Sequence, residues 1–159
     1  MHITGNPASV VDEGAFTVSR TIRINAPVEK VWRTVTDPEQ IARWFGRPEL
    51  DGHGQGASGT ISWPDRDPIP LRVERFDEPR VVAYRWNNDD ALGSAPESLD
   101  DACSTVFTFT LEPIGGGTQL TVVETGFDRT SDASSNMASH SHGWTIELDK
   151  LAALVEQSA

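Results

Sequence analysis

The hydrophobic pattern is clearest near the C-terminus. Four apolar side chains recur at spacings of 4, 3 and 4 residues, which places them on one face of a helix: Trp144, Leu148, Leu151 and Val155. This pattern predicts one long amphipathic helix over residues 136–157. Gly143 interrupts the pattern, and glycine in a helix costs about 1 kcal/mol relative to alanine. We therefore expect another element to approach the helix closely at Gly143.

The N-terminal third predicts one strand and two short helices. Residues 16–24 alternate apolar with polar side chains, as a half-buried strand does. Pro27 ends this strand and suits the first position of a helix, and apolar residues at helical spacing continue to Val35. Asp37 and Pro38 then provide the cap and the first residue of a second short helix.

Short strands fill the middle of the chain. A glycine-rich loop at 46–59 leads into five strand patterns, at about residues 59–63, 69–76, 81–87, 104–112 and 118–126. The segment 88–103 is polar and acidic, which is typical of a solvated loop. Together with the first strand, this predicts a sheet of about six strands. Residues 1–14 are polar and predict a flexible leader before a single domain at 15–159.

The order of these elements predicts an α+β helix-grip fold, in which a curved antiparallel sheet holds the long C-terminal helix. Five motifs follow the same order: INAPVEKVW at 24–32, IARWF at 41–45, RFDEPRVVAYRW at 75–86, GGTQLT at 116–121 and HxxGWxxxLxxL at 140–151. In these motifs the chain resembles the START-like (SRPBCC) superfamily. Within it, the chain is similar to the branch of the C-terminal domain of the activator of the ninety-kilodalton heat-shock protein's ATPase.

The resemblance covers about residues 16–157 and implies a cavity between the sheet and the long helix. It also implies a stress-response setting, but a fold of this kind hosts many functions. The co-chaperones of this branch carry a separate N-terminal domain that binds the chaperone, and this chain has no room for one. We therefore do not expect a chaperone partner, whereas a homodimer stays open.

Composition and charge narrow the classes of partner. The net charge of −11 repels phosphate backbones and anionic membrane surfaces, so we expect neither nucleic acid nor membrane as a partner. No apolar run is long enough to span a bilayer, and the N-terminus lacks the pattern of a signal peptide. Cys103 is the single cysteine, which suits a reducing compartment, and we expect a cytoplasmic protein.

Two patterns could suggest a cofactor or a metal, and neither has the required context. Glycines at 54, 56 and 59 match the spacing of a dinucleotide loop, but a strand rather than a helix follows them. His140 and His142 are two residues apart, so they point to different sides of a helix and do not chelate one metal ion. We expect no cofactor and no metal.

One carboxylate is a candidate for chemistry. If Leu120 and Val122 face inward, Glu124 faces inward too, and a buried carboxylate must be paired or protonated. Glu124 could act as a cavity acid together with Tyr84 or His140, as in cyclase-like relatives. It could equally be a structural partner of an arginine such as Arg72 or Arg75, and this alternative stays open.

Aromatic side chains are numerous for a chain of this length and could line an apolar pocket, although the same side chains could simply fill the core. The predicted ligand-binding residues are Trp44, Phe45, Trp63, Tyr84, Trp86, Phe107, Phe109, His140, Trp144 and Leu148.

Three functions are compatible with these observations. The leading hypothesis is non-catalytic binding of a small hydrophobic or amphipathic molecule between the sheet and the C-terminal helix, and a large dry cavity would favour it. The second is an enzyme of the cyclase or hydrolase type, favoured by a buried ionisable pair beside a pocket. The third is a chaperone-helper interaction module, favoured by an exposed apolar patch of several hundred Å².

Overall fold

A computed structural model of the chain describes residues 5–157 and contains one antiparallel sheet of eight strands in the order β1-β2-β8-β7-β6-β5-β4-β3. The strands are β1 (Val10–Asp12), β2 (Thr17–Ile24), β3 (Arg47–Asp51), β4 (Ser58–Trp63), β5 (Arg66–Asp77), β6 (Val81–Trp86), β7 (Thr105–Ile114) and β8 (Gly117–Thr125). The helices are α1 (Val28–Thr36), α2 (Pro38–Ile41) and α3 (Ala133–Gln157), with short 3₁₀ turns η1 (Asp101–Cys103) and η2 (Phe127–Arg129).

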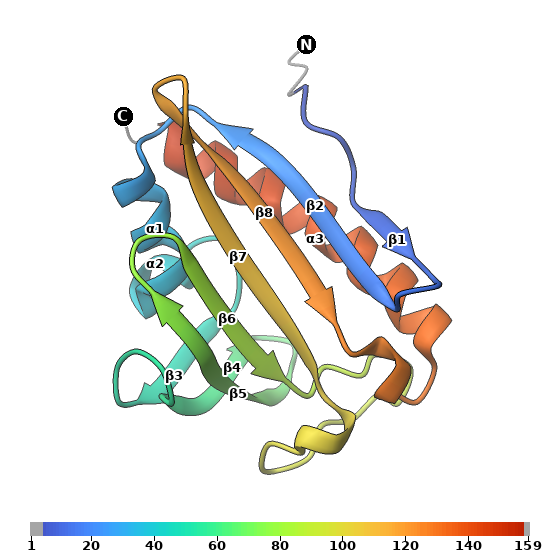
Figure 1. Cartoon of the computed structure of the whole chain (residues 1–159). Coiled ribbons are helices and arrows are strands. Elements are labelled where there is room, and N and C mark those ends of the chain that lie inside the picture. Colours follow the sequence, from blue (N-terminus) through green and yellow to red (C-terminus); the bar gives the residue numbers. More distant parts are fainter. Residues whose placement is uncertain (1–4, 158–159) are drawn as a thin grey trace.

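The long helix α3 lies along one face of the curved sheet (Figure 1). In that view α3 runs behind β2 and β8, and the short helices α1 and α2 lie at the left. The α+β helix-grip fold predicted from the sequence is confirmed. The part of the chain described here contains no helix that is long and apolar enough to cross a membrane.

Alternation along the strands decides which side chains enter the core. On β8, every second residue from Leu120 is buried: Leu120, Val122 and Glu124. The buried residues of α3 are Asn136, Met137, His140, Trp144, Leu148, Leu151 and Val155. The predicted apolar face of the helix is therefore correct, and it continues toward the N-terminus of α3 with two polar residues.

The structure differs from the sequence prediction at three places. Residues 10–12, expected within a flexible leader, form the edge strand β1 and pair with β2; residues 1–4 of that leader lie outside the described range. Part of the predicted glycine-rich loop is β3, paired with β4, so the sheet has eight strands rather than about six. The helix α3 begins earlier than expected, because the Asp132 carboxylate accepts a hydrogen bond from the Ser135 amide at 3.1 Å.

Gly143 does not mark a close approach, and that expectation is wrong. A Cβ atom placed on Gly143 would meet no atom within 4 Å outside its own surroundings in the helix. The residue instead lies at the wall of a surface depression described below. The absence of a side chain at this position therefore leaves space beside α3 open.

Candidate functional site

Aromatic side chains fill the space between the sheet and α3. A small apolar cavity remains beside them, between the sheet and the α1–α2 segment, and measures about 10 Å³, which is the room needed by about one water molecule. Phe45 occupies much of the space between the sheet and α3: its ring stacks on Trp44 at 5.0 Å and on Trp144 at 5.5 Å, and it meets Trp63 edge-on at 5.3 Å. The interior of this conformation is therefore packed.

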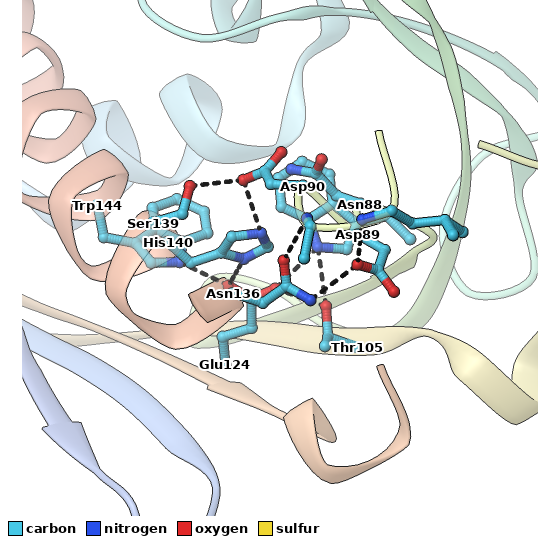
Figure 2. A network of polar contacts seen from close by, with 12 residues as sticks. Asn88, Asp89, Asp90, Thr105, Glu124, Asn136, Ser139, His140 and Trp144 are labelled. Carbon is cyan, nitrogen blue, oxygen red and sulfur yellow. Dashed lines mark hydrogen bonds and ion pairs between the residues drawn. The ribbon is translucent and has the colours of Figure 1, made fainter. Parts of the chain in front are cut away.

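A buried carboxylate lies next to this aromatic cluster. Glu124, from the end of β8, has no exposed surface and accepts hydrogen bonds from four side chains. One oxygen, Oε1, contacts His140 Nδ1 at 2.8 Å and Trp144 Nε1 at 2.9 Å. The other oxygen, Oε2, accepts from Trp86 Nε1 at 2.9 Å and from Thr105 Oγ1 at 2.5 Å. The carboxylate thereby joins β6, β7, β8 and α3 (Figure 2).

His140 lies between two carboxylates. Its Nδ1 atom contacts Glu124, and its Nε2 atom lies 3.3 Å from Asp90 Oδ2, close enough for an ion pair. Nε2 nevertheless makes no hydrogen bond of good geometry within residues 5–157. Asp90 also accepts a hydrogen bond from Ser139 Oγ at 2.7 Å, and Arg66 is 3.6 Å away from its other oxygen. The imidazole edge that carries Nε2 thus faces a partly solvated carboxylate.

The charges of this group stabilise one another. Burial by itself lowers the pKa of His140, but the charge of Glu124 and the contact with Asp90 outweigh it and raise that pKa to about 10. Burial by itself raises the pKa of Glu124, and the charge of His140 together with the hydrogen bonds brings it below its usual value. The contact with His140 lowers the pKa of Asp90 to about 2. At neutral pH, His140 is therefore an imidazolium held by two carboxylates.

The loop that carries Asp90 is fastened to α3 by a second carboxylate. We call residues 87–100, between β6 and η1, the 87–100 loop. Asp89 accepts hydrogen bonds from the backbone amide and the hydroxyl of Ser131, both at 2.7 Å, and from the Asn136 amide at 2.8 Å. Asn136 in turn accepts a hydrogen bond from the Ala91 amide at 2.9 Å. Asp89 and Asn136 therefore hold the loop in place independently of Asp90 (Figure 2).

A depression of about 270 Å³ opens at the surface between α3 and this loop. Its floor is aromatic and its walls are polar, and it is lined by Phe45, Trp86, Asp90, Ser139, His140, His142, Gly143, Trp144 and Glu147. The volume is near the lower end of the range for small-molecule sites, which is about 300–1,000 Å³. Phe45 is the one residue that lines both this depression and the small internal cavity.

Comparison with known protein families shows to which family the chain belongs. The model of the family described as Activator of Hsp90 ATPase homolog 1-like protein matches residues 25–156. The chain belongs to this family. Members of the family have folds associated with ligand binding or with cyclase-like activity. No curated protein matches the chain.

Several solved structures have the same fold as this chain. Protein MLL2253 from Mesorhizobium loti is 27% identical with a TM-score of 0.73, and the match covers 90% of this chain and 98% of that protein. DynU16, a protein in the dynemicin biosynthetic locus, is 28% identical with a TM-score of 0.70, covering 89% of this chain and 48% of DynU16. The Aha1 dimer from Colwellia psychrerythraea is 16% identical with a TM-score of 0.68, covering 88% and 96% respectively, and this likeness concerns the fold alone.

In the present structure, two of the three candidate catalytic residues predicted from the sequence lie together and the third lies apart. Glu124 and His140 are in direct contact. The Tyr84 hydroxyl instead donates a hydrogen bond to the backbone oxygen of Val35 at 2.6 Å, and burial raises the pKa of Tyr84. The open alternative of an arginine partner for Glu124 is wrong: Arg72 pairs with Glu74 and Asp101, and Arg75 with Asp77, on the other face of the sheet.

The predicted ligand-binding residues divide into two groups. Phe45, Trp86, His140 and Trp144 line the depression. Trp44, Tyr84, Phe107 and Phe109 line the small internal cavity together with Phe45. Trp63 packs against the ring of Phe45, and Leu148 is fully buried in the core. No group of three His, Cys, Asp or Glu side chains within residues 5–157 is placed to hold a metal ion.

The sequence analysis missed Asp90, Thr105, Ser139 and Asn136. Asp90 was interpreted as part of a solvated acidic loop, although it contacts the buried His140. A usable signal was present in α3, where Asn136 and His140 continue the Trp144 stripe at intervals of four residues. Polar side chains on a buried stripe need polar partners, which the acidic loop provides.

Proposed function

We propose that this domain binds a small, largely apolar molecule at the depression between α3 and the 87–100 loop, with its apolar part on Phe45, Trp86 and Trp144. The observation that supports this most is the combination of an aromatic floor with one ionised, deeply buried group at the wall, His140. Ligand sites commonly have this composition, mostly apolar with few polar anchors. The origin of the similar DynU16 in a biosynthetic locus also suits a site for a small molecule.

The electrostatics favour binding over proton transfer. A general acid or base works best when its pKa lies near the working pH. The pKa of His140 is raised to about 10 and that of Asp90 is lowered to about 2, so each group stays in one protonation state around neutral pH. Glu124 already accepts four hydrogen bonds and has no exposed surface. We therefore propose that the Glu124–His140 pair positions a hydrogen-bond donor rather than catalysing a reaction.

We extend the proposal to the interior of the domain through Phe45. Its ring borders both the depression and the internal cavity and is itself partly exposed. Rotation of this one side chain would join the two spaces and admit a ligand longer than the depression. Exposed aromatic side chains change rotamer on the picosecond-to-nanosecond scale, whereas packed ones move more slowly.

Substitution of Gly143, which lines the depression, tests whether a ligand binds there. In Gly143→Leu, the new side chain projects into the depression, where no atom lies within 4 Å of its Cβ. The matched control is Ala153→Leu, which adds a leucine to an exposed position on the same helix. Titration with an uncharged fluorescent naphthalene, followed through indole emission, should show saturable binding in the parent protein and in Ala153→Leu.

For Gly143→Leu, we expect at least a tenfold weaker affinity with the unfolding midpoint in urea little changed. Equal affinity of Gly143→Leu and the parent would show that the depression is not the binding site. No saturable response from the parent to naphthalenes of several sizes would show that the aromatic side chains only fill the core.

A further inference from the structure

We infer that the molecule bound at the depression is neutral and carries a carbonyl oxygen, which accepts the Nε2–H of His140 in place of Asp90. This inference rests on the proposed function and adds the chemical class of the ligand. The argument depends on how firmly the donor is held, how loosely its present partner is held, and which charges surround the site.

The donor is fixed in position and in protonation. Nδ1 of His140 is tied to Glu124 at 2.8 Å, and the ring lies between Trp86 and Phe127, with centroid distances of 5.9 Å and 5.2 Å. The ring therefore has little freedom to rotate, and its other nitrogen points toward the wall of the depression. As an imidazolium, His140 carries a proton on Nε2, and this N–H makes no well-formed hydrogen bond to the described residues. Its present partner, Asp90 Oδ2, lies 3.3 Å away, so a better-placed acceptor would gain a charge-assisted hydrogen bond.

Asp90 can leave without disrupting the loop. Its side chain keeps 31% of its surface exposed, and its other oxygen, Oδ1, lies 3.6 Å from Arg66, so the carboxylate still has a cationic neighbour when Oδ2 moves away from His140 and Ser139. The 87–100 loop stays attached to α3 through Asp89 and Asn136. A ligand oxygen can thus replace Asp90 by the motion of one side chain.

The surrounding charges select a neutral acceptor. The carboxylates at the site are matched by cations, since Asp90 and Glu124 face His140 and Glu147 pairs with Lys150 at 2.9 Å. A neutral ligand keeps this balance, and the net charge of −11 on the chain disfavours an anionic one. A cation offers no acceptor to the imidazolium. A carbonyl group is an acceptor without a charge, and when it is conjugated to a ring it lies flat, as the aromatic floor requires.

The experiment compares three probes that share one ring system: a dimethylamino-naphthalene with a propionyl group, the same compound with a propyl group, and the corresponding secondary alcohol. The emission of the ketone shifts to the red when its carbonyl accepts a hydrogen bond. We expect the ketone bound to the parent protein to show this shift, although its environment is apolar. The alcohol should bind no better than the propyl compound.

The decisive variant is Asp90→Ala, which removes the competing acceptor. We expect it to strengthen binding of the ketone by about tenfold, which corresponds to about 1.4 kcal/mol and to one charge-assisted hydrogen bond. Its affinity for the propyl compound should not change. The matched control Glu147→Ala removes a carboxylate that lines the depression but makes no contact with His140, and should leave the ratio of the two affinities unchanged.

The outcomes separate this inference from the proposed function. If the propyl compound and the ketone bind the parent equally and Asp90→Ala leaves their ratio unchanged, the depression is a binding site but the carbonyl inference is wrong. The same holds if the alcohol gains as much as the ketone, or if Glu147→Ala changes the ratio as strongly as Asp90→Ala. If no probe binds, the proposed function itself fails.

Discussion

Replacement of Glu124 by glutamine tests how the buried carboxylate holds the fold together. The change keeps the size of the side chain and removes its charge. The carboxylate accepts from four donors, two on each oxygen. A glutamine has one acceptor oxygen and one NH₂ group. Whichever way the amide is turned, its NH₂ group faces the N–H of an indole, either that of Trp86 or that of Trp144.

The expected loss follows from this geometry. If the NH₂ group faces Trp144, that indole N–H loses its acceptor, and a buried unsatisfied donor costs about 1–3 kcal/mol; if it faces Trp86, that indole N–H keeps Thr105 Oγ1 as an acceptor at 3.0 Å. The imidazolium of His140 also loses its closest counter-charge, and breaking one side of a buried ion pair costs about 3–5 kcal/mol. The two contributions overlap, and loss of the His140 proton relieves part of the second. We therefore expect the free energy of unfolding to fall by about 3 kcal/mol, out of a total of about 5–15 kcal/mol for a typical domain.

Equilibrium unfolding in urea at neutral pH, followed by tryptophan emission and far-UV circular dichroism, measures this loss. We expect a lower midpoint with an unchanged dependence on urea concentration. Glu112→Gln on the neighbouring strand β7 is the control, since its side chain is exposed and should change stability by less than about 0.5 kcal/mol. A change below about 1 kcal/mol for Glu124→Gln would refute the reasoning, because the network would then be contributing little to the fold.

Three further predictions concern the same region. The pKa of His140 is raised from 6.5 to about 10, so its contribution to stability is complete below pH 6.5 and is lost as the pH rises toward about 10; urea unfolding across this range should show the decline, and a flat profile would contradict it. Gly143→Ala should stabilise α3 by about 0.5–1 kcal/mol, because the added methyl group meets no atom within 4 Å; a lower urea midpoint would speak against this. Tyr84→Phe removes the hydrogen bond to Val35 and should cost about 1–2 kcal/mol of stability, while the affinity for the ketone probe stays unchanged because Tyr84 does not line the depression; weakened ketone binding would contradict its separate position.

Local patterns in the sequence were sufficient to predict the elements and their order. The spacing of Trp144, Leu148, Leu151 and Val155 predicts the buried stripe of α3, and the alternation at Leu120 and Val122 implies that Glu124 points inward. These inferences succeed because side-chain direction repeats with a fixed period within one helix or strand. The edge strands β1 and β3 were missed because they are short and mostly exposed, so they carry little apolar alternation.

The partners of Glu124 could not be predicted in the same way. The sequence determined that a carboxylate at this position must be paired or protonated, since burial of an isolated charge is too costly. Only the tertiary structure decided that His140, from a helix, and Asp90, from an acidic loop, supply the pairing. Contacts between distant segments depend on how the elements pack, and no local period encodes them.

The site for a ligand shows the same division. The sequence by itself predicted that many aromatic side chains gather in the interior of the domain, either as the lining of a pocket or as core filling. Only the tertiary structure decided that Phe45 fills this space, which leaves about 10 Å³ inside and a depression of about 270 Å³ at the surface. The physical reason is that a cavity is the small difference between the volume enclosed by the backbone and the volume of the side chains within it. One rotamer of one aromatic ring changes that difference, and the order of residues along the chain does not specify it.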